Sequence, residues 1–176
     1  MSERVQQRLE DTILTLVTQM LGSFGELRPV VRGASMVPSI FPDDVLIVRP
    51  ETARNACSGD VVLFFRDGLF CTHRVVGKIE EGGRISLLTC GDALSKNDPP
   101  VAEEEFLGLV AAVVRGPKRI EMGRPPVASE RLLRWAVRRS PGVAKWTLRW
   151  HLLRTRLAGN ARTGFATVRS TSLESV

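Results

Sequence analysis

The chain has 176 residues, of which 43% are hydrophobic and 25% are charged, a balance typical of globular proteins rather than of disordered or membrane-embedded ones. This length fits one domain with a terminal extension. The formal net charge of +6 favours an acidic partner, either nucleic acid or an anionic membrane surface. The charge is uneven, because residues 131–156 hold eight Lys or Arg and no acid. The basic character therefore belongs to the C-terminal tail.

Cysteine usage and the apolar runs indicate the compartment. Cys57, Cys71 and Cys90 form neither an even-numbered framework nor a CxxC pair, which favours a reducing environment. The N-terminus lacks the basic and then apolar segments of a secretory signal. The longest apolar runs, ILTLV and FLGLVAAVV, are far shorter than the ~18 residues of a membrane-spanning helix. We expect a cytoplasmic or peripherally membrane-associated protein.

Residues 1–27 are predicted to form an N-terminal amphipathic helix. Apolar residues recur every three or four positions from Val5 to Met20, the spacing that places side chains on one helix face. Ser2 is the expected N-cap and Gly22 the expected stop.

Residues 28–116 are predicted to form a β-sheet core. Short β-branched runs, VLIV, DVVLFF, LFCTHRVVGKIE and RISLLT, are separated by turn signals, as in a meander of strands. Asp67-Gly68 and Gly82-Gly83 are suited to hairpin turns. FLGLVAAVV is interpreted as a further strand that closes the sheet, although a buried helix would fit its pattern too. The expected fold is mainly β, with helices at both ends.

Beyond the core, residues 117–128 contain several prolines and are predicted to be a linker. Residues 129–158 are predicted to form two basic helices that carry all three tryptophans, and residues 159–176 a frayed end. Trp on the apolar side of a basic helix suits an anionic membrane surface. Packing on the core or on a partner protein is the commoner fate of such a stripe and stays open beside the membrane surface. Nucleic acid is disfavoured because no recognised binding motif accompanies the charge.

The segment VRGASMVPSIFPDD contains Ser35. A serine is a useful nucleophile only where a base takes its proton and donors hold the developing oxyanion. Of the two histidines, His151 lies in the basic tail, whereas His73 lies in the predicted strand CTHRVV. Histidine has an ordinary pKa of about 6.5 and serves as a base at neutral pH. His73 is therefore the candidate base for Ser35.

A carboxylate that orients the histidine would complete such a site. Asp92 and Asp98 in TCGDALSKNDPP are the candidates, although both also fit plain turn positions. Strand alternation places Cys71 and His73 on one face, so a zinc site built from Cys71, His73, Cys90 and Asp92 is a rival interpretation. Structural zinc sites usually draw on CxxC pairs in turns, so the cysteines fit better as small buried hydrophobes, and we expect no metal and no cofactor.

The segments GASMVPSI, SGDVVLFF, THRVVGKI and CGDALSKNDP resemble, in order and approximate interval, the boxes of the S24/S26 serine peptidases, which include type I signal peptidases and LexA-like proteases. The resemblance covers about residues 30–116 and is strongest to the endoplasmic-reticulum and SipW-like signal peptidases, which use histidine as base. It implies that Ser35 is the nucleophile, His73 the general base and Asp98 the third catalytic acid. Asp92 falls on the aspartate of the Gly-Asp box, in a supporting role.

Three further positions carry over from the resemblance. Met36 and Pro38 fall on residues that shape the nucleophile turn and the substrate cleft. Gly33 stands where many signal peptidases carry a hydroxyl residue that helps to bind the oxyanion, so the oxyanion hole is expected to use backbone donors such as the Ser35 N–H. A second departure is that an amphipathic helix occupies the place of the usual membrane anchor.

The resemblance implies a serine endopeptidase, similar to type I signal peptidase, that cleaves signal or leader peptides from a peptide or preprotein substrate. One alternative is a LexA-like self-cleaving or cytosolic leader-processing protease. The other is a non-catalytic module on the same fold that binds peptides or recruits partners to a membrane. The sequence leaves the oligomeric state open.

Overall fold

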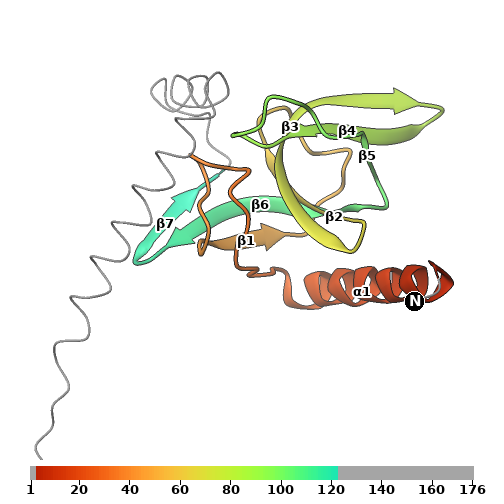
Figure 1. Cartoon of the computed structure of the whole chain (residues 1–176), viewed down its shortest axis with the longest axis horizontal. Helices are drawn as coiled ribbons and strands as arrows, with labels where there is room; N and C mark the ends of the chain where they lie inside the picture. Colours follow the sequence, from red (N-terminus) through yellow and green to blue (C-terminus); the bar gives the residue numbers. More distant parts are fainter. Residues whose placement is uncertain (1–2, 123–176) are drawn as a thin grey trace, which may run out of the picture.

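The computed structural model describes residues 3–122 (Figure 1). Helix α1 (Glu3–Phe24) precedes seven strands, and the predicted mainly β fold is confirmed. The strands are β1 (Val45–Arg49), β2 (Val61–Arg66), β3 (Leu69–Glu81), β4 (Arg84–Cys90), β5 (Val101–Ala102), β6 (Phe106–Arg115) and β7 (Lys118–Glu121). The predictions for Ser2, for His151 and for the 129–158 and 159–176 segments lie outside the described residues.

All strands pair antiparallel in one sheet of order β1-β6-β2-β3-β4-β5, with β7 on β6. The run FLGLVAAVV is a strand, as predicted, but it lies inside the sheet between β1 and β2 rather than closing an edge. The sheet is strongly coiled, so that β3 and β4 rise away from β1 and β6 (Figure 1). This curvature brings the start of β3 toward the loop that precedes β1.

The two predicted hairpin turns are confirmed. Asp67 and Gly68 have φ of 51° and 75° between β2 and β3, and Gly82 and Gly83 have φ of 58° and 79° between β3 and β4. Positive φ at both central positions matches the right-handed twist of the flanking strands. Strand β3, which carries His73, is thereby held between β2 and β4.

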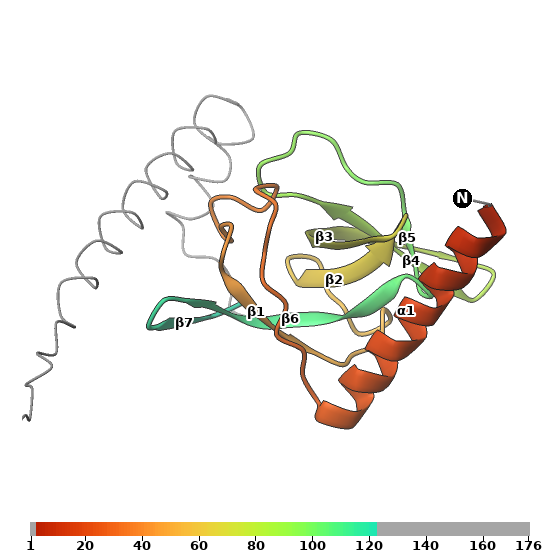
Figure 2. The same cartoon turned by 60° about the horizontal axis from the view of Figure 1, so that its bottom comes forward.

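Strand β2 is buried on both of its faces. Val61, Leu63 and Phe65 belong to one apolar cluster, and Val62 and Phe64 belong to a second. Successive side chains of a strand point to opposite faces, so an uninterrupted apolar run is expected where both faces are covered. Helix α1 lies along the outside of the sheet (Figure 2) and packs against the first cluster.

Helix α1 ends within the predicted segment 1–27 but beyond the expected stop at Gly22. It continues through Gly22 to Phe24, and Gly25 has φ of 71° and donates its N–H to the Leu21 carbonyl at 3.0 Å. A left-handed glycine after the last helical residue is a common C-terminal stop. Gly22 does not stop the helix because its own φ lies in the ordinary range.

The predicted apolar face of α1 is only partly buried. Ile13, Leu14 and Val17 pack against the sheet. Val5, Leu9, Leu16 and Met20 instead face outward and are 48–53% exposed. The helix carries two adjacent apolar rows, and the regular spacing in the sequence does not tell which row meets the sheet. No helix within residues 3–122 is both long enough and apolar enough to cross a bilayer.

The predicted linker 117–128 begins as a strand instead. β7 (Lys118–Glu121) turns back on β6 through Gly116, which has φ of 56°, and pairs Lys118 with Arg115. All four side chains of β7 are exposed, so the strand has no apolar alternation that the sequence could reveal. Backbone pairing with the end of β6 decides its conformation.

Candidate active site

The loop that carries Ser35 is fixed against the start of β1. Val31 donates its N–H to the Asp44 carbonyl and accepts from the Asp43 N–H, both at 2.9 Å. The buried Asp44 carboxylate accepts the Phe41 N–H at 2.8 Å and the Arg115 guanidinium at 2.7 Å. Charge-assisted hydrogen bonds of this kind are among the stronger ones, so the loop is held in place at both ends of its turn.

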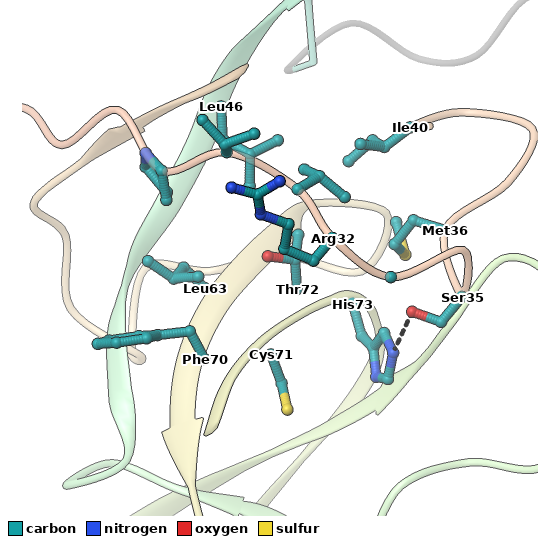
Figure 3. Close-up of a pocket in the computed structure, with 14 residues that line it drawn as sticks. Arg32, Ser35, Met36, Ile40, Leu46, Leu63, Phe70, Cys71, Thr72 and His73 are labelled. Carbon is teal, nitrogen blue, oxygen red and sulfur yellow. Dashed lines mark hydrogen bonds between the residues drawn. The ribbon is translucent and has the colours of Figure 1, made fainter. Parts of the chain in front are cut away.

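The three residues predicted to form the site come together. His73 Nε2 lies 3.0 Å from Ser35 Oγ (Figure 3). His73 Nδ1 lies 2.6 Å from Asp98 Oδ2. Ser35 comes from the loop before β1, His73 from β3, and Asp98 from the loop between β4 and β5. The His73 ring is mostly buried and packs edge-on against Phe64 at a centroid distance of 6.0 Å. The imidazole is therefore fixed in both position and rotation.

Thr89 contributes a contact that the sequence did not single out. Its hydroxyl donates to Asp98 Oδ2 at 2.6 Å, and its backbone carbonyl accepts the Asp98 N–H at 2.9 Å. Thr89 is fully buried, so this hydroxyl has no competing solvent. The contact holds the carboxylate in the orientation that meets His73.

Asp92 lies beside the Ser35–His73 pair but contacts neither side chain. Arg74, the residue after His73, donates hydrogen bonds to the Asp92 carboxylate from Nε at 2.9 Å and from Nη2 at 2.8 Å. Ser39, four residues after Ser35, donates to the same carboxylate. This Arg74–Asp92–Ser39 cluster ties together the three segments that carry Ser35, His73 and the Gly-Asp box.

The Gly-Asp box also needs its glycine. A Cβ atom at Gly91 would lie 2.7 Å from the Ser35 carbonyl oxygen, closer than atoms in van der Waals contact approach. The same carbonyl accepts the Ala93 N–H at 2.8 Å. The absence of a side chain at position 91 thus lets the two loops meet next to Ser35.

The loop that carries Asp98 is anchored by Arg66 at the end of β2. The Arg66 guanidinium donates to the carbonyls of Pro99 and Pro100 at 3.0 and 2.8 Å. It also holds the Glu105 carboxylate, at 2.6 Å from Nε. This hydrogen bond holds the pKa of Glu105 below its ordinary value of 4.5, against the opposing effect of burial.

A cavity of about 210 Å³ opens beside Ser35 and His73 (Figure 3). It lies between the 29–33 segment and the first half of β3, and most of its walls are apolar. The lining residues are Pro29, Val30, Val31, Arg32, Gly33, Ser35, Met36, Ile40, Leu46, Leu63, Phe70, Cys71, Thr72 and His73.

The residues predicted for the oxyanion hole and the cleft divide into two groups. Gly33 and Met36 line the cavity, whereas Pro38 lies in the same turn but not among the lining residues. A Cβ at Gly33 would meet nothing within 4 Å, so there is open space where relatives with a hydroxyl residue would place it. Among the described residues, no acceptor is bonded to the Ser35 backbone N–H.

Cys71 lies in the cavity wall two residues from His73. Burial, together with the nearby Asp98 carboxylate, raises the pKa of the Cys71 thiol above its ordinary value of 9.0. Because the thiolate is the reactive form of cysteine, this shift makes the Cys71 thiol less reactive than an ordinary exposed cysteine.

The rival zinc interpretation does not fit the geometry. Both ring nitrogens of His73 contact Ser35 and Asp98, and Asp92 is paired with Arg74. Cys90 faces backbone carbonyls at 3.4–3.6 Å. No cluster of three or more His, Cys, Asp or Glu in the described part of the chain is arranged to hold a metal ion.

A comparison of the chain with models of known protein families finds a match over the part of the chain that contains these residues. The model of the family described as Peptidase S24-like matches residues 10–110, more than half of the chain. The chain belongs to the Peptidase S24-like family. The match spans Ser35, His73 and Asp98 and ends within β6. No curated protein matches the chain. S24-like proteins are generally serine peptidases, which makes the described core a peptidase-type domain and agrees with the hydrolase class expected from the sequence.

Within this S24-like domain, three supporting residues escaped sequence reasoning. Thr89 lies directly before the Cys-Gly-Asp segment, Arg74 directly follows His73, and Ser39 follows Ser35 by four positions. Their positions next to the motifs of Ser35, His73 and the Gly-Asp box were the one sequence feature that could have pointed to them. Their roles depend on contacts between segments up to 53 positions apart, which no local pattern reveals.

Proposed function

We propose that this S24-like domain is a serine endopeptidase that cleaves signal or leader peptides with Ser35, His73 and Asp98. The observation that carries the proposal is the continuous contact from Ser35 Oγ through the His73 ring to Asp98, at 3.0 and 2.6 Å. A nucleophile, a base and an orienting carboxylate in hydrogen-bond reach are the parts that acyl transfer to serine requires.

The proposed proton path follows from the two His73 contacts. Asp98 accepts the Nδ1–H, which leaves Nε2 as the acceptor for the Ser35 hydroxyl proton. As Ser35 Oγ attacks the scissile carbonyl carbon, Nε2 takes that proton and Asp98 stabilises the imidazolium. His73 then gives the proton to the leaving amine, and water releases the acyl group from Ser35.

The oxyanion of the tetrahedral intermediate is assigned to backbone donors. The Ser35 N–H has no acceptor among the described residues, so it is available to a developing negative charge. Gly33 supplies no hydroxyl, and each missing donor commonly costs about 10²- to 10³-fold in rate. We therefore expect a slow enzyme rather than an inactive one.

An extended peptide is the substrate shape that suits the cavity. In the β2–β3 hairpin, Arg66 and Leu69 flank the two-residue turn Asp67-Gly68, and the pair that flanks a two-residue turn is hydrogen-bonded. Phe64 and Cys71 are the next hydrogen-bonded pair along the strands. Alternate residues of an antiparallel strand bond to opposite sides, so Phe70 and Thr72 direct their backbone groups away from β2. Pairing of β3 with β4 begins only at Arg74. A peptide added along this free edge would run past Ser35, in the manner of strand addition.

The test is cleavage by the purified full-length chain of a library of signal and leader peptides, followed by mass spectrometry. Ser35→Ala and His73→Ala should each abolish cleavage, and Ser58→Ala, at an exposed loop serine, should not. If wild type and both site variants leave every peptide intact, the endopeptidase assignment is wrong. Peptide binding without cleavage would instead support the non-catalytic module.

The same samples distinguish the self-cleaving alternative. Loss of intact chain on incubation, absent in Ser35→Ala, would identify self-processing of the LexA-like kind. A chain that stays intact while added peptides are cleaved would exclude it.

Contact with an anionic membrane surface through residues 129–158 is a separate part of the proposal, supported by their basic charge and three tryptophans. Flotation of the full chain with phosphatidylcholine vesicles, with and without phosphatidylglycerol, tests it. Binding should require the anionic lipid and weaken with salt. Absence of flotation with both vesicle types would remove the membrane surface from the proposal.

A further inference from the structure

The cavity beside Ser35 carries one charged side chain that the proposed chemistry does not use. Arg32 is the single Lys, Arg, Asp or Glu among the described lining residues. Its side chain extends across the cavity, over the space between Leu46 and Thr72 (Figure 3). A cation at a mostly apolar cleft is a feature that discriminates between ligands by charge.

The Arg32 guanidinium is available to a ligand. Its ion pair in the described structure is with Asp43, at 3.9 Å, and the two side chains are 83% and 79% exposed. Exposed pairs of this length contribute little free energy. A carboxylate on a bound peptide could therefore replace Asp43 without a large cost.

The backbone around Arg32 is also placed to receive an extended peptide. Val31 directs its N–H and carbonyl toward Asp44 and Asp43. Because backbone groups alternate along an extended segment, those of Val30 and Arg32 point to the opposite side, toward the cavity that both residues line. At about 3.3 Å per residue, Arg32 lies within about 10 Å of Ser35 along the segment.

We propose that Arg32 is a specificity-determining residue that selects peptides with an Asp or Glu side chain within about three residues of the scissile bond. The inference rests on the proposed peptidase function of the same cleft. Arg32 acts on binding of the peptide and takes no part in the bond-breaking steps. The competing negative charge is Asp43, whereas Asp98 is not among the residues that line the cavity and is already bonded to His73 and Thr89.

The test uses decapeptides with Ala on both sides of a central bond. Each of the three positions on either side receives Glu, Lys or, as the uncharged match, Gln, and kcat/KM is compared among the three peptides at each position. In wild type, Glu should exceed Gln at one position by about 2- to 5-fold, as expected for one solvent-accessible ion pair. Arg32→Gln should remove this preference, and Arg32→Glu should turn it into a preference for Lys over Gln.

Two further arms separate charge recognition from other effects. Asp43→Asn removes the competing carboxylate while keeping a residue that tolerates the φ of 70° found there, and it should increase the Glu preference. Raising the salt concentration should reduce it, because exposed charges are screened. Equal rates for Glu and Gln at all six positions, or a Glu preference that survives Arg32→Gln, would overturn the inference.

A binding measurement keeps this outcome distinct from failure of the peptidase assignment. Fluorescence anisotropy with labelled Glu and Gln peptides is run on Ser35→Ala, which cannot cleave. If the peptides bind with a Glu preference that depends on Arg32 but wild type cleaves none of them, the proposed peptidase function is wrong and the proposed charge selection by Arg32 stands. If wild type cleaves the peptides but neither the rate nor the binding differs between Glu and Gln, the peptidase function stands and the proposed charge selection by Arg32 is wrong.

Discussion

Gly91 and the Ser35 carbonyl oxygen approach so closely that a side chain cannot fit between them. A Cβ at position 91 would lie 2.7 Å from that oxygen and 3.0 Å from the Leu94 side chain. The backbone that presents the Ser35 hydroxyl to His73 is therefore shaped by the glycine of a different loop.

Gly91→Ala should both destabilise the domain and slow catalysis. The added methyl group must displace the Ser35 backbone or the Gly-Asp loop, and overpacking of this kind costs about 1–3 kcal/mol. Urea unfolding measures the first effect and peptide cleavage the second. Gly22→Ala, in α1 with nothing within 4 Å, is the matched control and should be neutral or stabilising. A Gly91→Ala protein as stable and active as wild type would show that the contact does not shape the site.

The Arg74–Asp92 pair should contribute far more to stability than surface pairs do. The two side chains are 14% and 5% exposed, and removing one partner of a buried pair leaves the other charge uncompensated, at a cost of about 3–5 kcal/mol. We expect Arg74→Gln and Asp92→Asn each to lower the free energy of unfolding by that order, and the double variant to lose less than the sum.

The exposed pair of Arg54 and Glu80, 3.5 Å apart, supplies the comparison for that measurement. Arg54→Gln should cost less than about 1 kcal/mol. If Arg74→Gln lowers the free energy of unfolding by no more than Arg54→Gln does, the Arg74–Asp92 pair does not hold the segments of the site together.

Gly33→Ser should increase the cleavage rate. The open space at this position accepts a side chain, and a hydroxyl there could supply a second donor to the oxyanion. One well-placed donor is worth about 10²- to 10³-fold, and we expect about 10-fold from one added without further adjustment. Gly33→Ala adds the same Cβ without a donor, so a Gly33→Ser rate no higher than that of Gly33→Ala would argue against an oxyanion hole at this place.

The Arg66–Glu105 pair should make stability depend on acid pH. The pKa of Glu105 is lower in the folded chain than its ordinary value of 4.5, so its contribution to stability is fully present above about pH 4.5 and is lost as pH falls through the folded pKa. Glu105→Gln should therefore destabilise the domain by about 1–2 kcal/mol at pH 7 and by less at about pH 3.

Urea unfolding at the two pH values measures this difference. Glu103→Gln, at an exposed position two residues away, should change stability little at either pH. A Glu105→Gln effect that is equal at both pH values would show that the charge of this carboxylate does not contribute.

Features that depend only on neighbouring residues could be predicted from the sequence alone. The β-branched runs predicted most of the strands, and the Asp67-Gly68 and Gly82-Gly83 pairs predicted their turns, because alternation and positive φ are local properties. Ser35, His73 and Asp98 were picked out by motif order. The same reasoning assigned residues 117–128 to a linker and missed β7, whose exposed side chains carry no alternation.

Other features were decided only when distant segments met. The sequence determined that the chain would form a mainly β core and which side chains could serve as nucleophile, base and acid. Tertiary structure decided which apolar row of α1 meets the sheet, that β6 lies between β1 and β2, and that Thr89, Arg74 and Ser39 hold the site in place. The physical reason is that periodicity and turn preference act over a few residues, whereas a hydrogen-bonded cluster such as Arg74–Asp92–Ser39 exists only where a coiled sheet brings three separate loops and strands within about 3 Å of one another.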